Sequence, residues 1–501
     1  MTSSFHIENF GCRAARADGE SVAERLHTSG LASGPMQEAD VVVVNTCSVT
    51  AEADREARAY IRRTHRLNPQ ARILVTGCYA QRAPQEIAAL EGVSAVVGNS
   101  HKAFAPQIAL SLANNGAVEP GALVPIDSIT SSGTAIWADD AFAHSFLEEA
   151  QVHPGVQTRP NLKIQEGCGN RCTFCVIPQT RGNPRSLPAE SILRQVRNFV
   201  AAGGNELVFS GINLGRWGRD LNLSQSLRAP SFERPLLEGW DSTKASRSTL
   251  ADLVRTILIE TALPRLRLSS IEPMDWDADL IALFREFPPT RLARHAHLPL
   301  QSGSDSVLRR MHRRYRPWHY LEKIAALTAA CPRFSSQDAI TFGADVMAGF
   351  PGETDAEFQE TYELIHALPF GYLHLFPFSP RPGTRAWELH RQSPVPPHIV
   401  TERMATLRTL AREKTRAHRQ PMLGQTLDAI TLHTPEALAR EGHTAALTQN
   451  FLPVQLKGVV GSNNLVTVRI SALADDLTLS ATLCSPHAAE DHTSSRSHAH
   501  S

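Results

Sequence analysis

Residues 163–175 read KIQEGCGNRCTFC and place Cys168, Cys172 and Cys175 at the spacing Cys-x3-Cys-x2-Cys. Three thiolates this close in sequence can wrap one corner of a cubane iron–sulfur cluster, and the fourth iron then keeps no protein ligand. Structural zinc is the alternative, but it takes four ligands, usually as two Cys-x2-Cys pairs, and no second pair follows nearby. The spacing therefore favours an iron–sulfur cluster whose open iron can bind a small ligand.

The composition of the chain is that of an ordinary globular protein. It has 501 residues, of which 42% are hydrophobic and 20% charged, and this length suggests about three domains. Lys+Arg and Asp+Glu both total 50, so any nucleic-acid surface has to be a local patch. Because the sequence shows neither a signal peptide nor a run of ~18 apolar residues, we expect a cytoplasmic protein with no membrane contact. Eight cysteines in such a chain favour metal binding or catalysis over disulfides.

Strands and helices alternate through the first hundred residues. The run ADVVVVNT (39–46) is apolar on both faces, as in a parallel sheet. Further strands are expected at 5–10, 72–76 and 94–97, and helices at 18–29, 51–67 and 84–90. The alternation predicts a small doubly wound α/β domain over residues 1–112.

Three further cysteines each follow one of these strands. Cys12, Cys47 and Cys78 end the segments IENFGC, VVVVNTC and RILVTGC. The carboxyl ends of parallel strands open onto one edge of a sheet, where ligands bind, so we expect the three thiols to converge. Buried core thiols are the alternative, which is common for one cysteine but less so for three at the same topological position.

The rest of the chain divides by composition. Residues 113–156 read as a linker, and β–α alternation resumes over 157–392, interrupted by an aperiodic insertion at 221–248. A charged linker helix is expected at 393–420 and a small β-barrel at 421–486, because short strands recur there at regular spacing. Residues 487–501 contain too few apolar side chains to fold and are expected to be a disordered tail.

With Phe174 just before the last cysteine, the motif at 168–175 resembles the signature of the radical S-adenosylmethionine (SAM) superfamily. The resemblance implies a partial (β/α) barrel, SAM chelated on the open iron and Phe174 against the adenine. It also implies that an electron from the cluster splits SAM into methionine and a 5′-deoxyadenosyl radical. Two glycine-rich segments resemble other SAM contacts of that superfamily, the first for the amino group and the second for the adenine: Gly203, Gly204 and Glu206, then Gly343 and Gly349.

The contexts NTCSVT (45–50), TGCYAQ (76–81) and VGN (97–99) resemble the amino-terminal domain of the methylthiotransferases. That resemblance covers about residues 5–485 and implies two [4Fe–4S] clusters, the auxiliary one on Cys12, Cys47 and Cys78. It further implies that one SAM methylates a sulfur on the auxiliary cluster, and that the radical from a second SAM removes hydrogen from the target carbon. Segment 421–486 resembles the TRAM module, an OB-like barrel that binds RNA. Cys331 and Cys484 fall outside these motifs and are interpreted as structural.

Four segments resemble the branch that converts N6-threonylcarbamoyladenosine 3′ of the tRNA anticodon to its 2-methylthio derivative: NTCSVTAEADREAR (45–58), RLSSIEP (267–273), HLPLQSG (297–303) and FPFSPRPGT (376–384). The alternatives are branches modifying isopentenyl-adenosine in tRNA, which usually have Arg where Thr50 stands, or a ribosomal protein aspartate. A non-enzymatic RNA-binding iron–sulfur redox sensor is the alternative outside catalysis. The chain departs from the branch at Ala15, where an Asn usually follows the first cysteine.

The resemblance implies tRNA and a flavodoxin- or ferredoxin-type electron donor as partners, with the sulfur donor unknown. Acidic residues outnumber basic ones in the barrel segment, so phosphate attraction is better sought in arginine-rich patches. These are Arg55, Arg58, Arg62, Arg63 and Arg66; Arg309, Arg310, Arg313, Arg314 and Arg316; and Arg181 with Arg185. A solvated helix face is the alternative for the first patch. Phe451 could stack on a base or fill the barrel core.

Overall fold

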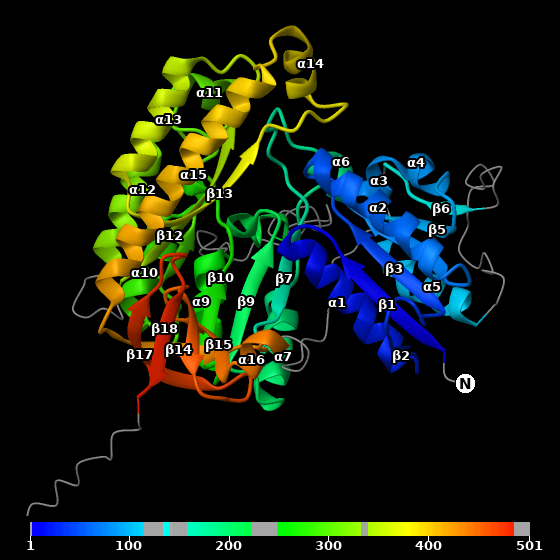
Figure 1. Cartoon of the computed structure of the whole chain (residues 1–501), viewed down its shortest axis with the longest axis horizontal. Helices are drawn as coiled ribbons and strands as arrows, with labels where there is room; N and C mark the ends of the chain where they lie inside the picture. The colour runs from blue at the N-terminus through cyan, green and yellow to red at the C-terminus, as the bar shows by residue number, and fades with distance from the viewer. Residues whose placement is uncertain are drawn as a thin grey trace, which may run out of the picture.

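The computed structural model describes residues 3–114, 134–140, 142, 158–221, 248–331 and 339–484. The expected fold class is confirmed: a doubly wound α/β unit, a partial β/α barrel and a closed β-barrel follow one another along the chain (Figure 1). All but the end residues of the expected 221–248 insertion, the tail at 487–501 and most of the expected 113–156 linker lie outside the described residues.

A six-stranded parallel sheet forms the amino-terminal unit, in the order β2-β1-β3-β4-β5-β6. Its strands are β1 (Ser4–Asn9), β2 (Ala32–Ser33), β3 (Val41–Thr46), β4 (Arg72–Gly77), β5 (Val93–Gly98) and β6 (Ala135–Trp137). Its helices are α1 (Arg13–Thr28), α2 (Ala51–Leu67), α3 (Cys78–Arg82), α4 (Pro84–Ala88), η1 (Lys102–Phe104) and α5 (Ala105–Ala113). Helices α1 and α5 pack on one face, and α2, α3 and α4 on the other. The strand order reverses between β1 and β3, at the point where such sheets bind ligands.

Two local features of this unit differ from the expectation. Helix α1 begins at Arg13 rather than at residue 18, because the Ala- and Arg-rich start favours helix and Cys12 takes the N-cap position. Strand β6 lies within the expected linker and pairs with β5. The sequence did not predict it, because three residues are too few to show the alternation typical of a strand. Helix α2 has the expected bounds, and its N-cap Thr50 accepts a hydrogen bond from Ala53 N at 3.2 Å.

Six parallel strands form the partial barrel, as two sheets joined by isolated bridges such as Ser270 to His297. They are β7 (Asn161–Glu166), β9 (Glu206–Gly211), β10 (Arg265–Leu268), β11 (His295–His297), β12 (Thr341–Ala348) and β13 (Phe370–Pro377), with β8 (Arg185–Ser186) antiparallel to β7. The helices are α6 (Ile177–Arg181), α7 (Ala189–Ala201), α9 (Leu250–Glu260), α10 (Ala278–Glu286), α11 (Asp305–Arg310), α12 (Pro317–Ala330), α13 (Asp355–Ala367), α14 (Arg385–Gln392) and α15 (Pro397–Arg419), with short turns η3 (Leu214–Arg216) and η4 (Pro273–Asp275). Most of the longer helices pack their apolar faces on the strands in one continuous core.

The carboxyl-terminal unit is a closed five-stranded barrel in the order β14-β15-β16-β18-β17. It comprises η6 (Gln420–Met422), β14 (Thr426–Thr431), α16 (Glu436–Arg440), β15 (His443–Thr448), β16 (Pro453–Lys457), β17 (Leu465–Leu473) and β18 (Leu479–Leu483). Asn463 binds the turn before β9, since its Nδ2 donates to Gly203 O at 2.8 Å. Among the described helices, none combines the length and apolarity needed to cross a bilayer.

Candidate functional site

Cys168, Cys172 and Cys175 lie in the loop between β7 and α6 and border a cavity of about 260 Å³. The cavity opens where the barrel strands end, which is the usual position of a site in such a fold. Its other lining residues are Asn170, Phe174, Ile177, Ile212, Asn213, Ser270, Glu272, Pro299, Gln301, Arg313 and Asp345. The structure therefore brings the three cysteines and Phe174 to one side of an open space.

Nitrogen donors surround the sulfur atoms of this trio. Asn170 N lies 3.4 Å from Cys168 Sγ, and Ile177 N lies 3.5 Å from Cys175 Sγ. Arg313 Nη1 donates to Cys172 Sγ at 3.3 Å. Burial raises the pKa of Cys175 to about 12, so a metal that binds here displaces a proton. Three sulfurs with N–H donors beside a cavity fit an iron–sulfur cluster with one open iron.

The second trio lies on three neighbouring strands. Cys12 follows β1, Cys47 follows β3 and Cys78 follows β4, so all three stand at one edge of the sheet. Gly11 has φ +97°, and a Cβ there would lie 2.5 Å from Cys47 Sγ, so only glycine allows this approach. Burial, with the nearby Cys78 and Cys12 sulfurs, raises the pKa of Cys47 to about 12. The converging thiols fit a metal cluster better than separate core positions.

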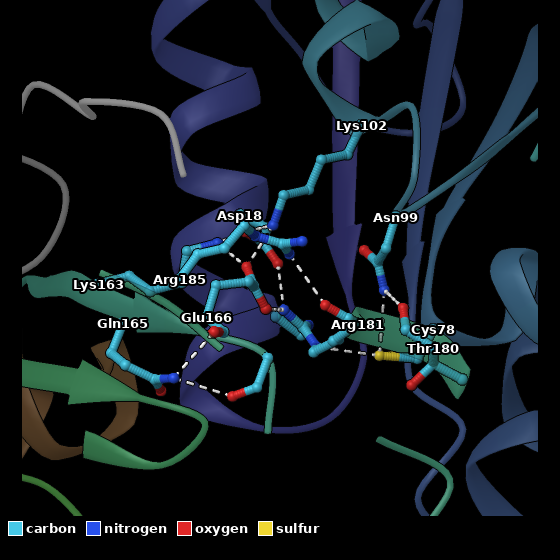
Figure 2. Close-up of polar contacts among 12 residues, drawn as sticks. Asp18, Cys78, Asn99, Lys102, Lys163, Gln165, Glu166, Thr180, Arg181 and Arg185 are labelled. Carbon is cyan, nitrogen blue, oxygen red and sulfur yellow. Dashed lines mark hydrogen bonds and ion pairs between the residues drawn. The ribbon is translucent and has the colours of Figure 1, made fainter. Parts of the chain in front are cut away.

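The short helix α6 joins the two trios. It begins at Ile177, beside Cys175, and ends at Arg181, whose Nε lies 3.2 Å from Cys78 Sγ (Figure 2). Asn99 also links the two units, because its Nδ2 contacts Cys78 Sγ at 3.4 Å and Thr180 O at 2.8 Å. Five helical residues span about 7.5 Å, so the trios lie at opposite ends of a very short element.

A polar chain on β11, β12 and β13 leads to the cavity at Asp345. Its carboxylate lies 3.2 Å from both His297 Nε2 and His374 Nδ1, and Tyr372 Oη lies 3.0 Å from His297 Nδ1. Although burial opposes ionisation, N–H donation from the two histidines holds the pKa of Asp345 well below its usual range. His297, Asp345 and His374 lie close enough together to bind a metal ion. Their polar atoms are already paired without one, because the Tyr372 hydroxyl donates to His297 and both histidines donate to Asp345.

Glu206, Gly203 and Gly204 lie at the amino end of β9, away from the cysteines. Glu206 is fully buried and receives Arg267 Nε at 2.8 Å, Arg265 Nη1 at 3.3 Å and Arg159 Nη1 at 3.5 Å. Although burial opposes ionisation, these arginines lower the pKa of Glu206 to about 2. The residue does not line the cavity, because a strand places its two ends on opposite sides of the barrel. The SAM amino-group contact expected from the resemblance has no counterpart at this position.

The glycines expected near the adenine lie on and after β12. Gly343 faces the Tyr372 ring, whose Cζ would lie 2.1 Å from a Cβ at this position. Gly349 has φ +78°, and its N donates to Glu353 Oε2 at 2.8 Å. The packing needs both glycines for close approach or backbone shape, and an adenine contact stays a prediction.

The arginines of the three predicted patches have different environments in the structure. Arg181 and Arg313 are buried and directed at cysteine sulfurs, so neither belongs to an exposed phosphate-binding surface. Several other members pair with acidic side chains: Arg309 and Arg316 with Asp305, Arg310 with Glu357, and Arg314 with Asp275. The exposed arginines on α2 are Arg55, Arg62, Arg63 and Arg66. Of the three predicted patches, the one on helix α2 is therefore the most open.

Phe451 packs between units rather than in the small barrel's core. Its ring stacks on His295 with centroids 4.2 Å apart, and the Arg267 guanidinium lies 5.4 Å from its centroid. Phe451 is absent from the cluster of side chains that fills the small barrel. The ring therefore joins the small barrel to β11, and neither expected role describes it.

The sequence left several cavity residues without a role, among them Asn213, Glu272, Gln301 and Asp345, and it placed Arg313 in a phosphate-binding patch instead. Glu272 and Gln301 stand in RLSSIEP and HLPLQSG, where they served only as branch markers. Position at the end of a barrel strand is the signal that could have found Asn213, two residues after β9.

Two family models match the chain. They are described as "Uncharacterized protein family UPF0004", matching residues 4–98, and "Radical SAM superfamily", matching residues 162–365. The first match contains Cys12, Cys47 and Cys78, and the second contains the other trio.

Several proteins are similar in sequence to this chain over almost its whole length. A Bacillus subtilis protein named threonylcarbamoyladenosine tRNA methylthiotransferase MtaB is 32% identical over 91% of this chain and 90% of its own length. A protein of that name from Aquifex aeolicus is 32% identical over 93% and 99%. A Geobacter metallireducens protein named tRNA-2-methylthio-N(6)-dimethylallyladenosine synthase is 31% identical over 93% and 95%. Among solved structures, the radical SAM methyltransferase TsrM from Kitasatospora setae shares the fold, with a TM-score of 0.52 and 15% identity over 78% of each chain.

Proposed function

This chain belongs to the methylthiotransferase family of radical SAM enzymes, and on that premise we propose that it converts N6-threonylcarbamoyladenosine in tRNA to the 2-methylthio derivative. One observation carries the proposal: two cysteine trios, one open to a cavity and one on the amino-terminal sheet, meet across helix α6. A radical SAM enzyme with one cluster needs only the trio at the cavity. The second trio could hold an auxiliary cluster, which a reaction that also delivers sulfur requires.

In the proposed reaction the C2–H of the adenine is replaced by a methylthio group. When bound, the two [4Fe–4S] clusters and SAM supply electron transfer, hydrogen abstraction and the sulfur and methyl groups. Such a C–H bond is too strong for acid–base chemistry, which agrees with a cavity built of sulfurs, amides and ion pairs rather than a nucleophile with its base.

The chain's own residues hold and shape this site. Cys168, Cys172 and Cys175 would ligate one cluster, and Cys12, Cys47 and Cys78 the auxiliary cluster. Phe174 supplies an apolar part of the cavity lining, and Asp345 supplies a fixed negative charge in the same lining. Because Asp345 is held by two imidazoles, it can accept a hydrogen bond from a ligand without moving.

Two kinds of relative have nearly equal identity, so the target base is argued from residues. Thr50 stands where the isopentenyl-adenosine branch usually has Arg, and it caps α2. Ala51 N next to it donates to Ser379 Oγ at 2.9 Å, which joins NTCSVTAEADREAR (45–58) to FPFSPRPGT (376–384). Two of the segments used to assign the branch therefore touch each other, and this supports threonylcarbamoyladenosine as the target.

We further propose that the tRNA approaches along α2 and the small barrel. Arg62, Arg63 and Arg66 give α2 an exposed basic face, and the small barrel resembles an RNA-binding module. A flavodoxin- or ferredoxin-type protein is proposed as electron donor, and the cytoplasm as compartment, because the tRNA pool and such donors are found there.

The test is nucleoside analysis by mass spectrometry of bulk tRNA from a strain lacking this chain, complemented with wild type or with Cys78→Ala. We expect the 2-methylthio-threonylcarbamoyl nucleoside to disappear, its precursor to accumulate, and wild type alone to restore it. Loss of the methylthio-isopentenyl nucleoside instead would assign the other tRNA branch. Unchanged tRNA with an unmodified ribosomal protein aspartate would contradict a tRNA target.

A further inference from the structure

Arg181 is a buried arginine that the proposed chemistry leaves without a role. Its side chain is 0% exposed, its Nε donates to Cys78 Sγ at 3.2 Å, and its Nη1 donates to Glu166 Oε1 at 2.6 Å and Asp18 Oδ2 at 3.0 Å (Figure 2). Among the described residues, Nη2 is buried with no partner, so one donor nitrogen of the guanidinium stays available.

The surrounding charges come from both units and are nearly balanced. Asp18 and Lys102 belong to the amino-terminal unit, whereas Lys163, Glu166 and Arg181 belong to the partial barrel. Lys102 and Lys163 each contact both carboxylates. Lys102, Lys163 and Arg181 therefore contact Asp18 and Glu166, three cations against two anions, and the Arg181 guanidinium is the cation that reaches the sulfur. Since arginine stays protonated, this charge is permanent.

The other trio has its own arginine. Arg313 donates to Cys172 Sγ at 3.3 Å from Nη1 and to both Glu272 oxygens at 2.7 and 2.6 Å from Nη2. Its side chain is 5% exposed, and its guanidinium lies 4.9 Å from the Tyr315 ring centroid. Each trio therefore receives one hydrogen bond from a buried, carboxylate-anchored guanidinium, and both arginines come from the partial barrel.

We propose that Arg181 and Arg313 are positioning residues that set the reduction potentials of the auxiliary and the SAM-binding clusters separately. This rests on the proposed function only in requiring a cluster on each trio. Hydrogen bonds to cluster sulfurs and nearby positive charge stabilise the reduced form, which carries one more electron. Removing either arginine therefore shifts the potential of its own cluster to a more negative value.

The rival explanation is that Arg181 only fastens the two units through its ion pairs. Arg181→Gln leaves Lys102 and Lys163 against Asp18 and Glu166, two cations against two anions, so the pocket stays balanced and the variant is expected to fold. A purely fastening role predicts lower stability with an unchanged cluster potential. The potential therefore separates the two explanations.

The experiment uses full-length protein in two backgrounds, each keeping one trio. With Cys168, Cys172 and Cys175 replaced by Ala, only the auxiliary trio remains, and its potential is measured by redox titration followed by EPR. We expect Arg181→Gln to give a negative shift there, Arg181→Lys a smaller one, and Arg313→Gln none. With Cys12, Cys47 and Cys78 replaced instead, Arg313→Gln should shift the remaining cluster and Arg181→Gln should not.

A second variant protects the test against misfolding. Asn99→Ala removes a neutral donor 3.4 Å from Cys78 Sγ and should shift the auxiliary potential in the same direction by a smaller amount. An unchanged auxiliary potential in Arg181→Gln, with iron content retained, would overturn the proposal. Iron missing from the auxiliary-only background would overturn both this inference and the proposed function. Shifted potentials with no modified nucleoside would overturn the proposed function alone.

Discussion

Arg381 Nη1 donates to Asp54 Oδ2 at 2.6 Å, and this contact joins the segment after β13 to the first turn of α2. Arg82 Nη2 shares the same oxygen at 2.7 Å, and Arg381 and Asp54 are almost fully buried. One carboxylate therefore holds two guanidiniums where the amino-terminal unit meets the barrel. The relative position of the two trios depends on this contact and on the Arg181 cluster.

Asp54→Asn should loosen this junction. It leaves the buried Arg381 and the partly buried Arg82 guanidiniums without their anion, and breaking a buried pair in this way costs about 3–5 kcal/mol. We expect the midpoint of urea unfolding to fall accordingly, while iron content under native conditions is retained. Glu52→Gln is the control, since its pair with Arg55 is exposed and should change stability by less than about 1 kcal/mol. Equal effects of the two variants would contradict the role of the junction.

Iron and acid-labile sulfide content should report two independent clusters. Anaerobically reconstituted wild type should hold about eight irons, and the Cys168→Ala/Cys172→Ala/Cys175→Ala variant about four. The complementary variant of Cys12, Cys47 and Cys78 should also hold about four. Cys484→Ala is the control and should match wild type, because Cys484 lies outside both trios. About four irons in wild type and none in the first variant would show that Cys12, Cys47 and Cys78 hold no cluster.

Glu206→Gln should affect stability rather than SAM binding. The folded pKa of Glu206, about 2, lies below its unfolded value near 4.5. Its stabilisation is therefore complete above that unfolded value and is lost as pH falls toward 2, which corresponds to about 3 kcal/mol. Urea unfolding between pH 7 and pH 3 should show a flatter pH dependence in the variant.

SAM binding separates the two interpretations of Glu206. Equilibrium dialysis of folded Glu206→Gln should give wild-type affinity, because the side chain lies at the amino end of β9. A large loss of affinity in the folded variant would support the amino-group contact expected from the resemblance. Glu286→Gln is the matched control for stability, since its pair with Arg255 is on the surface.

Asp345→Asn should weaken the binding of the ligand that fills the cavity. The substitution keeps the shape but removes the fixed charge, and a lost charge-assisted hydrogen bond corresponds to about 1.5–3 kcal/mol, or roughly 10- to 150-fold in affinity. Dialysis with SAM and with substrate tRNA would show which ligand depends on it. Asp355→Asn is the control, because that carboxylate is 92% exposed and is not one of the lining residues. Unchanged affinity for both ligands would contradict a binding role.

Single substitutions on α2 should reduce the salt dependence of tRNA binding. Each of Arg62→Ala, Arg63→Ala and Arg66→Ala removes one phosphate contact and should lower the slope of log K against log salt by about 1. Arg285→Ala removes another exposed arginine, on α10 rather than α2, and should leave the slope unchanged. If all four variants had the same slope of log K against log salt, the tRNA would not bind along α2.

Local pattern in the sequence determined the fold class and the two groups of cysteines. The apolar run before Cys47 predicted a buried parallel strand, and β3 is buried along its whole length. Cys12, Cys47 and Cys78 could be grouped because each follows a strand, and parallel strands share one edge. Helix α2 has the bounds that the sequence predicted, and Asn68-Pro69 directly after Leu67 is a sequence signal for its end. These features depend on residues within one helix or strand, where spacing alone fixes geometry.

Only the tertiary structure decided which charged residues serve the site. Arg181 and Arg313 read as parts of basic patches, yet each is buried against a cysteine sulfur, and Glu206 pairs with arginines at the other end of its strand. Gln301 and Asp345 reach the cavity from different segments. The partners of a buried charge come from segments far apart in the chain, and their attraction depends on distance and burial in space. Sequence spacing carries no record of those distances, so the charge pattern around the clusters emerges only when the units pack together.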